Sequence, residues 1–442
     1  MTMKCKALII FLAAFLLFSS NALSGNDKQE DIPRPAREVL HEAQCLMERG
    51  RTDAAIKTLE DFKKRGEKKC REGCQDRKGY HHYMVDFFLG SAKYNKGDLN
   101  SAAQNFEEAV NKKQDFAQGW LNLGTCCHQC GKMAKAAESY LRGYRSSENK
   151  DPSILYLAGA AFLAAGDSAK SVEILAELFA INPESVKPEW KETYAHALVR
   201  NEQHKEALPV LEDLAETAPE NRRKGWREFL LHEYLFLEMH EKALAFAVRL
   251  TEDYPLEPKW WKTLASLHLQ RKEYEQALVN LDVYANLQPL TDKEARLAAD
   301  LYLAVNIPAR AQGLYEAIAR EKSDVAVIRN LACSWQKLQQ PEKALQWVEK
   351  GLEQGEQADL MGLKANLLYS LERYREAADA FEKTAEKKHD CGRAWLMAGY
   401  SAMNAGDANR AKIALAKAAK YKCHRDAAKK LLAYLEKAAP EQ

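Results

Sequence analysis

The sequence has 442 residues, of which 46% are hydrophobic and 29% are charged, with only 21 glycines and 13 prolines. This composition is typical of a helical globular protein and excludes a collagen-like or a disordered chain. The 65 basic residues nearly balance the 63 acidic residues, which leaves a net charge of +2. We therefore expect no nucleic-acid partner, because neutralising phosphates requires a concentrated excess of Lys and Arg.

The N-terminus has the pattern of a secretory signal peptide. Lys4 and Lys6 precede an unbroken apolar run over residues 7–18, which is shorter than the roughly 20 residues that a membrane-spanning helix needs. Small residues offer cleavage sites after Ala22 or Ser24. The pattern predicts a signal peptide over residues 1–24, a flexible segment over 25–35 and export to the periplasm. The short run disfavours an uncleaved anchor.

An atypical helical hairpin is predicted over residues 36–65, with Gly50 and Ala55 as weak markers of a repeat. Residues 66–82 follow as a basic insertion that contains two Cys and two adjacent His. The order and spacing of these four side chains match no standard zinc site. We therefore expect an irregular loop here and no bound metal.

From residue 83 onward, a pattern with a period of about 34 residues recurs. One copy reads Trp120-x-x-Leu123-Gly124-x-x-Cys127. A small residue marks each copy, 33 to 36 residues after the previous one: Ala102, Ala136, Ser171, Ala207, Ala243, Ala277, Ala311, Ala344, Ala377 and Ala411. The pattern resembles the tetratricopeptide repeat, W-x2-L-G-x2-Y followed by A-x3-F and P, which implies two antiparallel helices in each repeat.

Such helical pairs must stack, because one pair cannot bury its apolar face alone. We therefore predict an all-α fold, an α-solenoid in the form of a right-handed superhelix, with about ten repeats over residues 83–425 and a capping helix over 426–438. The sequence contains no glycine-rich phosphate loop, H-E-x-x-H motif or G-x-S-x-G motif. We therefore expect a protein that is not an enzyme and has no cofactor or metal.

Trp190, Trp226 and Trp260 occupy the third position of three consecutive repeats, one residue before the usual Trp. Because their spacing follows the repeat, they lie along one surface of the predicted solenoid. We favour rings that pack on the second helix of the preceding repeat, since Trp usually buries most of its surface. The alternative is a hydrophobic seam for a partner, since Trp is frequent at binding hot spots.

In tetratricopeptide arrays, partners generally bind the groove lined by the second, fifth, ninth and twelfth positions of the repeats. The candidate binding residues are groove positions and the three Trp: Phe87, Tyr94, Leu121, His128, Trp190, Trp226, Lys259, Trp260, Lys262 and Ser266. At the double Trp, we expect Trp260 to face the partner and Trp261 to lie in the core. The paired Lys and Asn with which chaperone adaptors hold a peptide carboxylate are not present as a set.

A narrower resemblance rests on Pro255-Leu-Glu-Pro-Lys-Trp260-Trp261 and on Asn306-Ile-Pro308-Ala-Arg-Ala311. These stretches resemble exported tetratricopeptide proteins of TonB transport systems, which share a double Trp and an I-P-x-R-A turn in the next repeat. The resemblance covers about residues 220–350. It implies a periplasmic accessory of the TonB–ExbB–ExbD complex at the inner membrane. The alternative is an adaptor in outer-membrane or envelope biogenesis, which binds precursor proteins or the polysaccharide and peptidoglycan machinery.

The C-terminal part is basic, with eleven Lys or Arg against three Asp between residues 387 and 430. We interpret the excess as a solvated cap, or as a surface for weak association with anionic lipids or an acidic partner. Cys391 and Cys423 fall in equivalent loops of adjacent repeats. In an oxidising compartment we expect them to form a disulfide that staples the last repeat, with two free thiols as the alternative.

Overall fold

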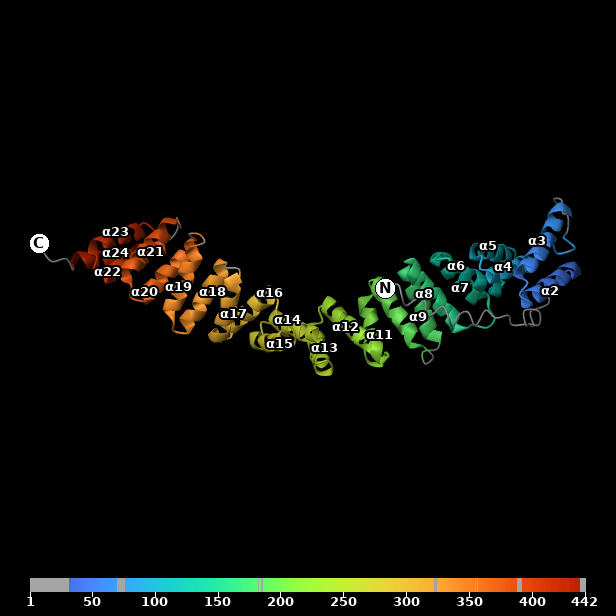
Figure 1. Cartoon of the computed structure of the whole chain (residues 1–442), viewed down its shortest axis with the longest axis horizontal. Helices are drawn as coiled ribbons and strands as arrows, with labels where there is room; N and C mark the ends of the chain where they lie inside the picture. The colour runs from blue at the N-terminus through green and yellow to red at the C-terminus, as the bar shows by residue number, and fades with distance from the viewer. Residues whose placement is uncertain are drawn as a thin grey trace. The chain divides into compact units, whose positions relative to one another are not determined.

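The computed structural model describes residues 32–69, 76–181, 183, 186–321, 324–353, 355, 357–387 and 392–437. These residues form 23 α-helices and, within the same ranges, no strand. The chain divides into two compact units, Met1–Leu237 and Glu238–Gln442. In each unit, helical hairpins follow one another along the chain (Figure 1). The prediction of an all-α solenoid is therefore confirmed.

The helices of the first unit are, in chain order, α2 (Arg34–Glu48), α3 (Thr52–Lys69), α4 (Tyr83–Lys96), α5 (Leu99–Lys112), α6 (Ala117–Gln129), α7 (Met133–Ser146), α8 (Pro152–Ala165), α9 (Ser168–Ile181), α10 (Pro188–Arg200), α11 (His204–Thr217) and α12 (Glu220–Phe236).

The helices of the second unit are α13 (His240–Asp253), α14 (Pro258–Gln270), α15 (Tyr274–Leu287), α16 (Asp292–Ala304), α17 (Pro308–Glu321), α18 (Val325–Lys337), α19 (Pro341–Glu353), α20 (Ala358–Ser370), α21 (Tyr374–Lys387), α22 (Gly392–Asn404), α23 (Ala408–Ala418) and α24 (Arg425–Lys437).

A residue in the left-handed backbone conformation follows each first helix and fixes the register of the repeats. These residues have φ between 55° and 90°: Gly97, Gly131, Gly166, Glu202, Glu238, Lys272, Asn306, Gln339, Glu372 and Gly406. Each of them lies five residues before one of the small residues that mark the predicted repeats. Gly50 has a φ of 72° and lies five residues before Ala55, so α2 and α3 are joined by the same kind of turn.

A small residue at the eighth position of the first helix lets the two helices of a hairpin approach closely. A Cβ atom on Gly124 would lie 2.7 Å from a ring carbon of Tyr140, and one on Gly159 would lie 2.7 Å from Cγ of Leu175. Real side-chain atoms do not approach so closely, so glycine is required at these contacts unless the neighbour shifts. The sequence pattern thus reflects a direct contact between the helices.

The last helix, α24, covers the end of the second unit. Ala428 is fully buried, and Leu431, Leu432 and Leu435 pack against the hydrophobic core from the same helix. Tyr434 on the other side is 63% exposed. The helix therefore has one apolar face and one solvated face, as the terminal helix of a repeat array requires.

Within the described residues, no helix combines the length and apolarity that crossing a bilayer requires. The predicted signal peptide lies outside those residues. So does Cys391, and its predicted disulfide with Cys423 therefore stays a prediction.

The left-handed turns generate a prediction about Gly97 and Gly225, where an added Cβ atom would meet none of the described atoms within 4 Å. Gly97 has a φ of 89°, so we expect Gly97→Ala to lower the free energy of unfolding by about 1 kcal/mol through backbone strain. Gly225 lies in α12 with ordinary helical backbone, so Gly225→Ala should raise the free energy of unfolding by about 0.4–1 kcal/mol. Urea unfolding followed by circular dichroism measures both, and effects of the same sign would contradict the turn assignment.

Candidate interaction surface

First helices of successive repeats contact one another through polar side chains. In the first unit, Nε2 of Gln129 on α6 donates a hydrogen bond of 2.8 Å to Oη of Tyr94 on α4. The hydroxyls of Tyr156 on α8 and Thr193 on α10 are 3.1 Å apart. We define the inner row of a unit as the second, fifth, ninth and twelfth residues of its first helices, counted from Tyr83 in α4 and from the equivalent residue of each later repeat.

The predicted binding residues divide into an accessible group and a buried group. The following residues are at least partly exposed: Tyr94, Leu121, His128, Lys259, Lys262 and Ser266. Phe87 also belongs to the inner row but is only 8% exposed, and its ring lies 4.9 Å from that of Phe116. The assignment of Phe87 to a binding surface is therefore wrong, because neighbouring aromatic rings cover it.

The predicted tryptophan stripe is buried, with exposed fractions of 7% for Trp190, 8% for Trp226 and 2% for Trp260. The Trp190 ring stacks on Tyr156 at 5.3 Å, and the Trp226 ring lies 5.1 Å from that of His196. These partners lie on α8 and α10, the first helices of the preceding repeats. The rings of Trp190 and Trp226 therefore pack on the preceding repeat, although on its first helix. All three rings are buried, so the hydrophobic seam that was the alternative is wrong.

The roles expected for the double Trp are reversed. Trp260 is in the core, whereas Trp261 is partly exposed and its Nε1 donates a hydrogen bond of 2.8 Å to the carbonyl oxygen of Pro255. Trp260, Leu264 and Leu267 follow one another at intervals of four and three residues, so they share the buried face of α14. The next residue along a helix is rotated by about 100°, which takes Trp261 out of that face.

Lys262 is exposed, but its charge is engaged by the next first helix. Its Nζ lies 2.6 Å from Oε1 of Glu294 on α16. Glu294 also accepts hydrogen bonds from the hydroxyl of Tyr284 and from the backbone and hydroxyl of Thr291. The ammonium group of Lys262, together with the other donors, lowers the pKa of Glu294 to about 2. This ion pair therefore joins α14 to α16.

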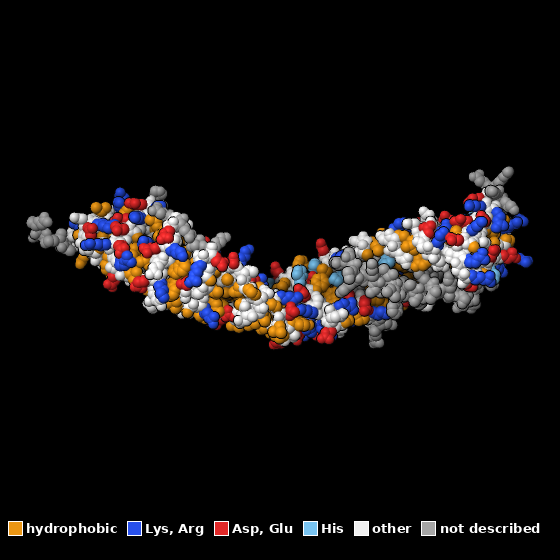
Figure 2. Space-filling model, in the orientation of Figure 1, with side chains coloured by type: hydrophobic (Ala, Val, Ile, Leu, Met, Phe, Trp, Pro, Cys, Tyr) orange, Lys and Arg blue, Asp and Glu red, His pale blue; other side chains and the backbone are white. Residues whose placement is uncertain are grey.

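A second ion pair of the same kind links α16 to α18, where a guanidinium nitrogen of Arg296 lies 2.9 Å from Oδ2 of Asp324. On the face of the second unit in Figure 2, basic and acidic side chains lie beside one another and do not separate into large patches of one sign. Lys262 and Arg296 therefore connect neighbouring elements of the second unit.

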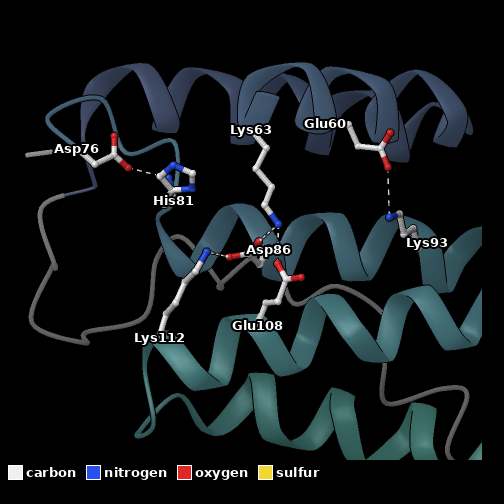
Figure 3. A network of polar contacts seen from close by, with 8 residues as sticks. All are labelled: Glu60, Lys63, Asp76, His81, Asp86, Lys93, Glu108 and Lys112. Atoms are coloured by element: carbon white, nitrogen blue, oxygen red, sulfur yellow. Dashed lines mark hydrogen bonds and ion pairs between the residues drawn. The ribbon is translucent and has the colours of Figure 1, made fainter. Parts of the chain in front are cut away.

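A buried carboxylate joins three helices at the start of the first unit (Figure 3). Asp86 on α4 has no exposed surface, and its Oδ1 lies 2.6 Å from Nζ of Lys63 on α3, while Oδ2 bonds to Lys112 on α5. Lys63 also lies 2.6 Å from Oε2 of Glu108. Burial opposes the charge on Lys63, but its hydrogen bonds to both carboxylates prevail and raise its pKa. The network thus holds the N-terminal hairpin against the following repeat.

Sequence reasoning missed Asp86. It stands at the fourth position of its repeat, where Trp120 and Trp395 stand in two others. A charged residue at a core position requires a buried partner. That conflict with the repeat pattern is the signal that was available in the sequence.

Two cysteines of α6 do not have the character of reactive thiols. Cys126 and Cys127 are buried on α6. Burial raises the pKa of Cys126 to about 12 and also raises that of Cys127, which disfavours the nucleophilic thiolate. Over the described ranges, no group of three or more His, Cys, Asp or Glu side chains is arranged to hold a metal ion.

The stacked hairpins and the inner row define the class of protein as an α-solenoid scaffold. Two segments, residues 89–152 and 363–428, match the family model of the tetratricopeptide repeat. The chain therefore contains tetratricopeptide repeats, which generally serve as non-catalytic scaffolds that bind other proteins. No curated protein matches the sequence.

Solved structures that are similar to the chain include the Naa15/Naa10 complex bound to HypK, at 14% identity and a TM-score of 0.41, with 86% of this chain and 68% of that chain covered. A tetratricopeptide repeat protein from Parabacteroides merdae is similar at 14% identity and a TM-score of 0.32, with 61% and 99% covered. Yeast Tom70 is similar at 15% identity and a TM-score of 0.31, with 90% and 95% covered. None of these likenesses bears on what this chain binds.

The burial of the double Trp generates a prediction about stability. We expect Trp260→Ala to lower the free energy of unfolding by about 3–5 kcal/mol, because it leaves a cavity in the core. Trp261→Ala, one residue away, should cost clearly less, because Trp261 is already partly exposed. Urea unfolding of the two variants compares them directly. An equal or larger loss for Trp261→Ala would show that the register of α14 is wrong.

The depressed pKa of Glu294 generates a prediction about pH. Because its pKa is about 2 in the folded chain and about 4.3 in an unfolded one, its ionised form stabilises the fold above about pH 4.3, and this contribution is lost as the pH falls toward 2. The stability difference between the wild type and Glu294→Gln should therefore shrink between pH 7 and about pH 2.5 in urea unfolding. Glu275→Gln, on the exposed surface of α15, is the control. A difference that does not change with pH would contradict the ion pair.

Proposed function

We propose that this protein is a non-enzymatic, exported scaffold that acts in the periplasm as an accessory of a TonB–ExbB–ExbD system. The observation that carries the scaffold role is the stack of tetratricopeptide repeats, whose first helices contact one another and present accessible residues in an inner row. The resemblance of residues 255–261 and 306–311 to exported proteins of TonB systems supports the choice of partner. The signal-like residues 1–24 support export.

The experiment is affinity capture of the tagged full-length chain from envelope extract, with TonB, ExbB and ExbD quantified by mass spectrometry. We expect at least one of the three to be enriched over an unrelated exported protein with the same tag. N-terminal sequencing of the captured chain tests export, because cleavage after Ala22 or Ser24 should remove the first residues.

A pair of variants links capture to the inner row. Ser266 is exposed in the inner row of α14, and Val279 is 62% exposed on the second helix α15. Ser266→Trp should reduce capture, whereas Val279→Trp, a change of similar bulk outside the inner row, should leave it intact. Enrichment of none of the three proteins would reject the TonB assignment. Equal loss in both variants would reject the inner row of α14 as the contact surface.

A further inference from the structure

Most of the positive charge at the C-terminal end of the second unit has no ion-pair partner. Residues 408–435, which span α23, the following turn and most of α24, contain eight Lys or Arg and one acidic residue, Asp426. Among the eight, Arg410 alone forms an ion pair with a described residue, and it engages both Asp379 and Glu382 on α21. We call the other seven the basic surface: Lys412, Lys417, Lys420, Lys422, Arg425, Lys429 and Lys430.

Three members of the basic surface lie on the compact turn that joins α23 to α24. Nε of Arg425 donates a hydrogen bond of 3.3 Å to the carbonyl oxygen of Ala419, which ties the start of α24 to the end of α23. The turn also packs on α22, where a Cβ atom on Gly392 would lie 2.6 Å from Cβ of Tyr421. All three basic side chains of the turn are exposed. The fold therefore holds these charges close to one another at the surface.

The basic surface differs from the charged residues of the earlier repeats. Lys262 and Arg296 pair with acidic residues of the elements that follow them. On α23, the ammonium group of Lys417 instead lies 3.9 Å from the centre of the Trp395 ring, and that contact does not cancel its charge. The seven cations therefore form a positive field that is available to an anionic ligand.

Large apolar side chains are exposed among these cations. Ile413 on α23 is 61% exposed, and Tyr434 on α24 is exposed to a similar extent. Lys420 follows Ile413 by seven residues, which is about two turns of helix, so the two side chains share the solvent face of α23. Tyr434 follows Lys430 by four residues and lies on the same side of α24. Each of the two elements therefore combines positive charge with apolar surface.

We propose that the basic surface binds the headgroups of an anionic lipid membrane, with Ile413 and Tyr434 reaching the headgroup layer. Anionic headgroups attract Lys and Arg that lie near the membrane. Apolar and aromatic side chains beside these cations add the burial of carbon surface at the interface. The inference goes beyond the proposed function, because this membrane contact requires none of TonB, ExbB and ExbD.

Two features favour lipid over an acidic protein segment. Six of the seven cations are Lys, whereas proteins more often hold carboxylates with the planar fork of Arg. The cations are also distributed over two helices and a turn, as suits an extended layer of headgroups. Ile413 and Tyr434 have a role at a membrane, but they offer nothing to a run of carboxylates.

The test is flotation of the full chain with two kinds of vesicle, one of phosphatidylcholine alone and one that also contains phosphatidylglycerol as about a third of its lipid. At about 0.05 M salt we expect binding to the anionic vesicles that is about tenfold tighter, or more, than binding to the neutral vesicles. At about 0.5 M salt this preference should disappear, because salt screens the attraction between exposed charges.

A pair of double variants locates the contact. Lys420→Glu with Lys422→Glu reverses two exposed charges of the basic surface. It should weaken binding to the anionic vesicles by about 25-fold or more, since each cation near such a membrane strengthens binding about fivefold. Lys205→Glu with Lys272→Glu makes the same change in net charge at exposed positions of earlier repeats and should leave binding nearly unchanged. Circular dichroism and thermal unfolding verify that the variants are folded.

A second pair of variants tests the apolar contribution. Ile413→Asn and Val279→Asn replace β-branched side chains of similar exposure, 61% and 62%, on the second helices α23 and α15. Ile413→Asn should weaken binding to the anionic vesicles several-fold, because it removes apolar surface that leaves water at the membrane. Val279→Asn should not change the binding, and equal effects of the two variants would contradict the contact of Ile413 with lipid.

The outcomes separate this inference from the proposed function. The absence of binding to anionic vesicles, equal binding to both kinds of vesicle, or equal effects of the two double variants would overturn the membrane contact. Saturable binding of a labelled hexaglutamate peptide without vesicle binding would overturn it in favour of an acidic protein partner. Failure to capture TonB, ExbB and ExbD together with intact vesicle binding would reject only the proposed partner system.

Discussion

The close contact between the two helices of each hairpin is the constraint on which the structure depends. Gly124 and Gly159 allow bulky side chains of the second helix to reach the backbone of the first. The left-handed residue that follows the first helix turns the chain so that the second helix of the same hairpin makes this contact. Because each hairpin has the same apolar faces, the core of each unit extends from one hairpin to the next. This stacking also places equivalent positions of the first helices side by side, which forms the inner row.

The repeat register could be predicted from the sequence because its determinants are local. The small residue of the second helix and the turn before it lie within one hairpin, and both recur in every copy. The orientation of Trp260 and Trp261 could not be predicted in the same way. Adjacent residues of a helix point in directions about 100° apart, so an error of one position in the register exchanges the buried and the exposed residue. The ion-pair partner of Lys262 could not be predicted either, because Glu294 belongs to the following repeat and charged residues are common on helix surfaces.

The chemistry of the accessible surface differs from what aromatic content suggested. The large rings of Trp190 and Trp226 are buried against the preceding repeat, so they are not available to a ligand. The inner-row side chains that do reach solvent on α4, α6 and α8 are smaller and uncharged, whereas in the second unit Lys262 and Arg296 form ion pairs. The accessible inner row therefore differs from helix to helix by modest side chains and not by large aromatic rings.

Asp86 gives the array a defined beginning. A solenoid built from equivalent hairpins has no intrinsic reason to start at one hairpin and not at another, since each apolar end face accepts a further unit. The carboxylate of Asp86 removes that equivalence. Lys112 of its own repeat engages Oδ2, but Oδ1 faces Lys63 of the preceding hairpin, so a hairpin without a cation at that place would cover this oxygen without supplying an ion-pair partner. The ion pair between Lys63 and Asp86 thus favours the packing of α3 on α4. It disfavours the out-of-order stacking and domain exchange to which repetitive chains are prone.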